Sequence, residues 1–152
     1  MLDLEQELDA VLSALDANHI EYALCGGLAM AIHGYPRATV DIDLLVKAND
    51  HARIFSAVEP LGFRVHAKPM TFYRGAVQIR RVTKIDSDGE ALMLDLLFVT
   101  PANASAWRSR QAVTWRGRSI AVVSPEGLIA LKLRRASKQD LADIERLRRG
   151  EQ

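Results

Sequence analysis

The amino-acid sequence predicts an α/β fold, in which helical and strand segments follow one another along the chain. Residues 2–18 repeat leucine and valine at three- and four-residue steps, which is the stripe of an amphipathic helix. Residues 40–46 and 91–99 are instead short apolar runs rich in leucine and β-branched residues, as buried strands are. The apolar face of the first helix is therefore expected to pack on a sheet.

The composition narrows the class of protein. The chain has 152 residues, of which 49% are hydrophobic and 26% charged, and this balance is typical of a globular protein. We expect one domain over residues 1–152, with its core at about residues 20–100. The formal charge of +1 gives no overall attraction to nucleic acid. The single cysteine, Cys25, fits a small buried core residue in a reducing compartment.

No apolar run is long enough to cross a bilayer, and no charged leader precedes an apolar core. We therefore expect a cytoplasmic protein with no membrane partner.

The first half of the chain alternates between helix and strand. After the helix at 2–18, a short buried strand is expected at 20–24, and the glycine pair at 26–27 interrupts it. The small and apolar residues 28–32 suit a tightly packed helix, which the Gly-Tyr-Pro sequence at 34–36 ends.

The middle of the chain reads mainly as strands. Asn49 and Asp50 can cap a helix that Pro60 and Gly62 close. The strands are expected at residues 40–46, 63–65, 71–82 and 91–99, with a turn at 86–89.

The last third carries a strong helix start. A strand is expected at 119–123, and Ser124 then caps a helix whose first position is Pro125. Two helices are predicted, at 125–135 and 138–148.

Two aspartates occupy alternate positions in the strand at 40–46. Side chains two residues apart point the same way, with Cα atoms roughly 6 to 7 Å apart, so Asp41 and Asp43 project from one face. Two carboxylates about 5 Å apart repel by roughly 3 kcal/mol at an effective dielectric constant near 20. A cation is therefore expected between them.

A third carboxylate, Asp95, lies within the apolar strand at 91–99. Burying it is costly unless it is paired or ligates a metal. If its strand lies beside that of Asp41, three carboxylates converge. Such oxygen ligands suit Mg²⁺ or Mn²⁺, and two ions of this kind can assist phosphoryl or nucleotidyl transfer.

The glycine pair, Gly26 and Gly27, stands at a predicted helix start. Backbone N–H groups there can hold phosphate oxygens. A glycine pair alone is more often a structural turn, whereas its combination with the aspartate pair and Asp95 is more specific.

The segment GGLAMAIHGYPRATVDIDLLV, residues 26–46, followed by the Asp95 strand, resembles the nucleotidyltransferase superfamily, which includes DNA polymerase β and the tRNA CCA-adding enzymes. Within it, the chain looks most like small bacterial proteins grouped with the AbiEii-type toxin nucleotidyltransferases. The likeness covers residues 22–99 and extends to the segment 132–144.

The resemblance implies a nucleotidyltransferase fold, in which a mixed β-sheet is flanked by helices. It implies nucleotide phosphates at Gly26 and Gly27, and metal binding and catalysis by Asp41, Asp43 and Asp95. The implied reaction transfers a nucleoside monophosphate from an NTP, such as ATP, to a hydroxyl, and pyrophosphate leaves. The acceptor hydroxyl can belong to RNA such as a tRNA 3′ end, to a protein, or to a small molecule. A toxin–antitoxin role would add an antitoxin or another partner protein.

Many active members carry serine or threonine directly after the glycine pair, where this chain has Leu28. A leucine cannot hydrogen-bond a phosphate oxygen. The alternative reading is therefore a non-catalytic protein of the same fold that binds a nucleotide or a partner.

Several residues have both a functional and a structural reading. Arg37 can reach a phosphate or be a surface arginine. In similar enzymes, a lysine on the helix after the catalytic sheet helps neutralise the triphosphate, and Lys132 is the candidate. His33 is read first as a cap or packing residue. Asp143 belongs to a polar segment similar to one of the family, although helix faces of this composition are usually solvated.

Overall fold

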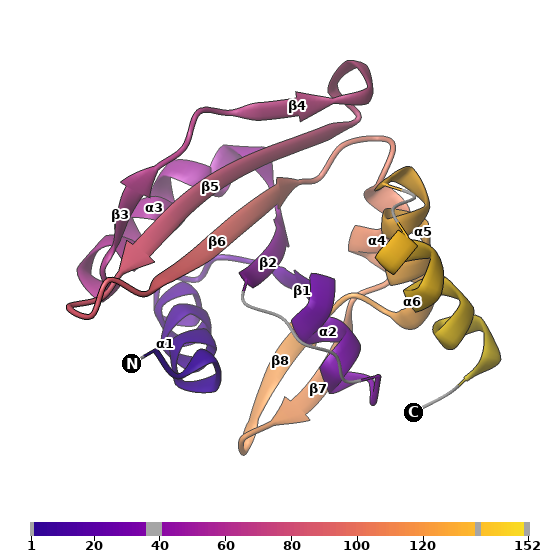
Figure 1. The fold of residues 1–152 in the computed structure, drawn as a ribbon, viewed down its shortest axis with the longest axis horizontal. Helices are drawn as coiled ribbons and strands as arrows, with labels where there is room; N and C mark the ends of the chain where they lie inside the picture. Colours follow the sequence, from indigo (N-terminus) through magenta and orange to yellow (C-terminus); the bar gives the residue numbers. More distant parts are fainter. Residues whose placement is uncertain (1, 36–40, 136–137, 151–152) are drawn as a thin grey trace.

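The computed structural model describes residues 2–35, 41–135 and 138–150, and the side chains of residues 132–141 lie outside this description (Figure 1). The described helices are α1 (Leu4–Ala17), α2 (Gly26–Ile32), α3 (His51–Val58), α4 (Ala104–Arg108), α5 (Pro125–Arg135) and α6 (Lys138–Arg149). The described strands are β1 (Ala23–Cys25), β2 (Asp41–Val46), β3 (Phe63–His66), β4 (Met70–Phe72), β5 (Val77–Ile85), β6 (Ala91–Phe98), β7 (Gln111–Trp115) and β8 (Arg118–Val122).

These strands form one mixed sheet, in the order β3-β5-β6-β2-β1-β8-β7, with β4 paired to β5. The β2–β6 and β1–β8 pairs are parallel, and the other pairs are antiparallel. Strand β2 is therefore central, with β1 on one side and β6 on the other. The fold class predicted from the sequence is confirmed.

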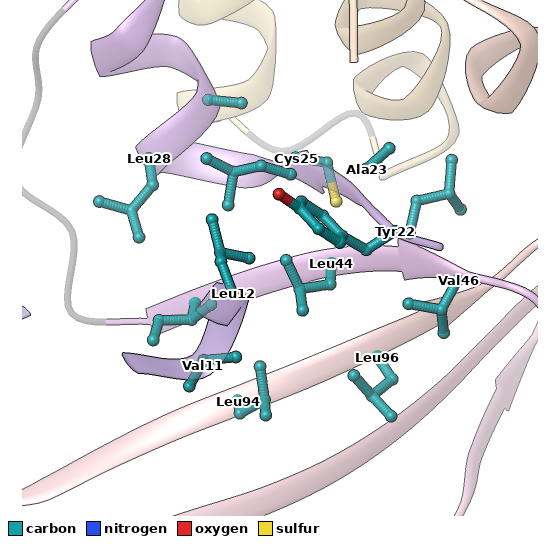
Figure 2. Packing of buried hydrophobic residues seen from close by; sticks show 14 of the residues in the cluster. Val11, Leu12, Tyr22, Ala23, Cys25, Leu28, Leu44, Val46, Leu94 and Leu96 are labelled. Atoms are coloured by element: carbon teal, nitrogen blue, oxygen red, sulfur yellow. The ribbon is translucent and has the colours of Figure 1, made fainter. Parts of the chain in front are cut away.

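The two faces of β2 differ in chemistry. Ile42, Leu44 and Val46 are completely buried on one face. Helix α1 covers this face, and Figure 2 shows its Leu12 beside Leu44 and its Val11 beside Leu94 of β6. Alternation along the strand turns its two aspartates to the opposite face. The main core thus fixes the strand that presents the acidic residues.

Helix α2 and the helices of the C-terminal part of the chain contact or approach the sheet at other places. Helix α2 follows β1 without an intervening loop and packs against β2. Helices α4, α5 and α6 gather near the end at which β6 finishes (Figure 1).

The predicted strand over 71–82 is wrong as a single element. Strand β4 ends at Phe72 and β5 begins at Val77, and the two pair as an antiparallel hairpin. The chain reverses at Tyr73–Gly75, where Tyr73, Arg74 and Gly75 have positive φ angles of 52°, 54° and 89°. A reversal this tight interrupts an apolar run whose β propensity alone favours continuation.

Helix α4 and strand β7 were not predicted. Helix α4 has only five residues, too few to show a helical period. Strand β7 is joined to β8 by Arg116 and Gly117, both at positive φ, which is the geometry of a two-residue hairpin turn.

Among the described residues, no helix combines the length and the apolar character that a membrane span needs.

Candidate active site

The strand register brings Asp43 beside Asp95. The two residues are direct partners in the parallel β2–β6 pair, and neighbouring strands lie about 4.8 Å apart. Asp41 lies two residues before Asp43 and so shares its face. We call this surface the carboxylate face: Asp41 and Asp43 of β2, Asp95 of β6 and Arg81 of β5. The three predicted carboxylates thus lie on one face of two adjacent central strands.

Asp41 is in an unfavourable environment for a carboxylate. Its Oδ1 atom is buried and accepts no hydrogen bond from the described part of the chain. Burial raises the pKa of Asp41 above its usual value, and repulsion from Asp95 adds to this increase, while Arg81 partly offsets it. An unsatisfied carboxylate oxygen of this kind is a suitable ligand for a hard divalent cation.

Asp95 is held by Arg81, a residue that the sequence reasoning missed. Arg81 Nε donates a hydrogen bond to Asp95 Oδ1 at 2.7 Å, and Arg81 Nη2 donates one to Asp95 Oδ2 at 2.9 Å. The two residues are direct partners on antiparallel β5 and β6. The hydrogen bond to Asp95 raises the pKa of Arg81 further above its usual range. The turn at 86–89 sets this register, so the pair could have been found by counting back from the turn.

Gly26 joins helix α2 to the carboxylate face. It is the first residue of the helix, and it follows Cys25, the β1 partner of Asp43. A Cβ atom at Gly26 would lie 2.8 Å from Asp43 Cγ, and its φ of +67° is unfavourable for other residues. Only glycine therefore allows the Asp43 side chain to lie against the helix start.

The next two helical positions face inward. Gly27 is buried, and Leu28 is only 9% exposed, packed within the main core (Figure 2). The side chain of Leu28 contributes to stability and offers no hydroxyl at the helix start.

The carboxylate oxygens of Asp41, Asp43 and Asp95 are the kind of ligand that Mg²⁺ or Mn²⁺ requires. The buried Oδ1 of Asp41, with Asp43 two residues away, fits one such ion. Asp95 is already engaged by Arg81. Across the described residues, no three His, Cys, Asp or Glu side chains are grouped so that they could hold a metal ion together.

A cavity of about 100 Å³ opens beside these residues. One wall is formed by the α2 start and two of the carboxylates, and the other walls are largely apolar. The lining residues are Cys25, Gly26, Asp43, Asp95, Asn103 and the apolar Val77, Ile79, Leu97, Leu128 and Leu131. The cavity can therefore receive an uncharged group close to the carboxylates.

The structure describes the other residues singled out in the sequence to different extents. Arg37 lies outside the described residues, and Lys132 belongs to α5 with its side chain outside them. His33 Nε2 lies 2.8 Å from the carbonyl oxygen of Val123, which supports its structural reading. Asp143 is completely buried, so the expectation of a solvated helix face is wrong for this residue.

Comparison with known proteins agrees with this architecture. The antibiotic-resistance factor ANT(2″)-Ia has a TM-score of 0.66 and 17% identity, over 96% of this chain and 84% of its own. A candidate nucleotidyltransferase from Thermotoga maritima has a TM-score of 0.63 and 17% identity, over 98% and 94%. The lincosamide antibiotic adenylyltransferase LnuA has a TM-score of 0.55 and 17% identity, over 95% and 96%. These likenesses show the shared fold.

No curated protein matches the chain by sequence. A protein family described as "Uncharacterised nucleotidyltransferase" matches residues 2–148, almost the whole chain. Together with the mixed sheet that carries three carboxylates on its central strands, this match shows that the chain belongs to that nucleotidyltransferase family.

Proposed function

We propose that this chain is a metal-dependent nucleotidyltransferase that moves a nucleoside monophosphate from an NTP to an acceptor hydroxyl. The observation that carries the proposal is the register of β2 and β6, which sets Asp43 beside Asp95 and leaves a buried oxygen of Asp41 without a hydrogen-bond partner among the described residues. Cations near such a strand pair offset the repulsion between its carboxylates.

Each residue has a role in this reaction. Asp41 and Asp43 hold Mg²⁺ or Mn²⁺, which when bound neutralises phosphate charge and stabilises the leaving oxygen. We assign the β- and γ-phosphates to the backbone N–H groups at Gly26 and Gly27, and additional positive charge to Lys132 and Arg37. Asp95 completes the metal site and helps to take the proton of the acceptor hydroxyl.

The bond changes balance without any further reactant. The acceptor oxygen forms a bond to the α-phosphorus, and the bond from that phosphorus to the bridging oxygen breaks. Pyrophosphate leaves with the electron pair of that bond, and the hydroxyl proton passes to a carboxylate.

The acceptor we favour is the hydroxyl of a small molecule. ANT(2″)-Ia is known in complex with adenylyl-2″-tobramycin, and LnuA is an adenylyltransferase of lincosamide antibiotics. The cavity of about 100 Å³ beside Asp43 and Asp95 is of a size for one group of such a molecule. Transfer to RNA or to protein stays a prediction that label transfer from NTPs to each of these acceptor classes tests. A toxin–antitoxin role like that of AbiEii-type proteins also stays a prediction.

A non-catalytic nucleotide-binding protein of this fold is the second candidate, and Leu28 is the observation that favours it. Its side chain is packed in the core, at the position where many active members of the superfamily carry serine or threonine. Retention of the three carboxylates on one face favours catalysis.

Thermal unfolding with each of the four NTPs, with and without Mg²⁺, tests the nucleotide site. Ligand at 100 times its Kd stabilises by about 2.7 kcal/mol, which raises Tm by about 5 to 10 °C in a domain of this size. The shift should require Mg²⁺ and disappear in the Asp41→Asn, Asp43→Asn double variant. Absence of a shift with every NTP would contradict both candidates, whereas a shift without nucleotide transfer to any acceptor would select the binding protein.

A further inference from the structure

We propose that Arg81 and a divalent cation compete for the Asp95 carboxylate, so that without nucleotide the chain takes one ion at Asp41 and Asp43. A second ion then binds only when Arg81 leaves Asp95. This inference rests on the proposed metal-dependent function and identifies Arg81 as the residue that sets the order of loading.

The Arg81–Asp95 ion pair occupies both oxygens of the carboxylate. Both oxygens of Asp95 accept a hydrogen bond from the Arg81 guanidinium, at 2.7 and 2.9 Å. A bidentate pair of this kind is among the stronger charge-assisted contacts in proteins. The Asp95 side chain is only 13% exposed, so little of it remains open to another ligand.

The net charge of the carboxylate face suits one divalent cation. The three carboxylates and the guanidinium of the carboxylate face give a formal charge of −2 when all four are ionised. One divalent cation balances this charge, and a second would add an excess of +2 in a partly buried place. Without Arg81, the formal charge would be −3 and would favour further cation binding.

The Arg81 side chain is exposed enough to take another partner. Its side chain is 33% exposed, in contrast to that of Asp95. A guanidinium binds phosphate oxygens with the same two-pronged geometry that it uses for a carboxylate. The triphosphate of an NTP therefore offers Arg81 an alternative partner and supplies the negative charge that a second ion needs.

The test is a titration of the full chain with Mn²⁺ in the absence of nucleotide, with bound metal counted by electron paramagnetic resonance and affinity measured by calorimetry. Wild type should bind one ion. Arg81→Gln should bind two ions, with an affinity for the second ion at least about tenfold above any that wild type shows over the same Mn²⁺ range, because the variant removes the charged competitor. Adding Asp95→Asn to Arg81→Gln should abolish this second site.

Arg80→Gln is the matched control. Arg80 has the neighbouring position in β5, lies 5.0 Å from the centre of the Phe98 ring and is paired in register with Leu96, on the opposite face. The variant loses the same charge but should bind Mn²⁺ as wild type does. If Arg81→Gln fails to fold, Arg81→Lys keeps a cation with a single contact point, and it should show an intermediate gain in affinity.

Unchanged or weaker Mn²⁺ binding by a folded Arg81 variant, with wild type binding Mn²⁺ and NTP, would overturn this inference alone. An equal gain in the Arg80→Gln control would also overturn it, because net charge would then explain the effect. Absence of Mn²⁺ binding to every variant, together with absence of an NTP-induced thermal shift, would overturn the proposed function as well.

Discussion

The side chain of Asp43 lies against the backbone of Gly26, in the space that a Cβ atom would need. That Cβ atom would be 2.8 Å from Asp43 Cγ and 2.9 Å from its Cβ. Asp43 is also the register partner of Cys25, the last residue before the helix. The start of α2 and the acidic strand therefore fit together only through glycine.

Gly26→Ala should destabilise the protein more than Gly89→Ala does. Both glycines have positive φ, +67° and +83°, so each alanine pays about 1–2 kcal/mol of backbone strain. A Cβ at Gly89 would meet nothing within 4 Å, whereas one at Gly26 collides with Asp43. Overpacking adds about 1–3 kcal/mol at Gly26 alone. Urea unfolding of the two variants gives the difference, and equal losses of stability would contradict the close approach.

Asp41→Asn should raise the stability of the metal-free protein at neutral pH. The folded-state pKa of Asp41 is raised above its usual value of 3.8, mainly by burial. The stability that protonated Asp41 contributes is therefore complete below its unfolded pKa and is lost as pH rises through the folded pKa. Asparagine does not ionise and avoids this loss.

The measurement is Tm in EDTA across the acidic and neutral range. The advantage of Asp41→Asn should be largest above the folded pKa and should disappear at low pH. Excess Mg²⁺ should reverse the order of the two proteins, because only the carboxylate binds the ion strongly. A variant less stable than wild type at pH 7 in EDTA would be evidence against an unsatisfied carboxylate at this position.

His33→Ala should lower the free energy of unfolding by about 1–2 kcal/mol through the loss of one partly buried hydrogen bond. Its Nε2 lies 2.8 Å from the carbonyl oxygen of Val123, a completely buried residue, and the contact ties the end of α2 to the segment before α5. His33→Gln keeps a donor and should recover part of the loss. Denaturant unfolding measures both values, and NTP affinity should change little. A large loss of NTP affinity with unchanged stability would instead assign His33 to the substrate.

Elements with strong local signals could be predicted from the sequence. Helix α5 begins at Pro125 as expected, and the Ser124 hydroxyl accepts a hydrogen bond from the Gly127 backbone N–H at 3.0 Å. Strand β2, which carries Asp41 and Asp43, could also be predicted. The apolar residues around its alternating acids determine both its extent and its two faces. In these cases the residues that determine the structure are neighbours in the chain.

Features that depend on distant residues were missed or misjudged. The reversal at Tyr73–Gly75 divides a run with continuous strand propensity. Arg81 meets Asp95 only because two strands pair across a turn. Asp143 is completely buried, and it belongs to α6, a helix that packs on α5. Local patterns carry little information about such contacts.

The central claim is tested most directly by transfer of label from α-labelled NTPs, with Mg²⁺ or Mn²⁺, to separate small-molecule, RNA and protein fractions of a bacterial lysate. The Asp41→Asn, Asp43→Asn double variant is the control, with folding checked by circular dichroism. We predict label in the small-molecule fraction with wild type and none with the variant. Absence of transfer to all three fractions by folded wild-type protein, or equal transfer by the double variant, would contradict the claim.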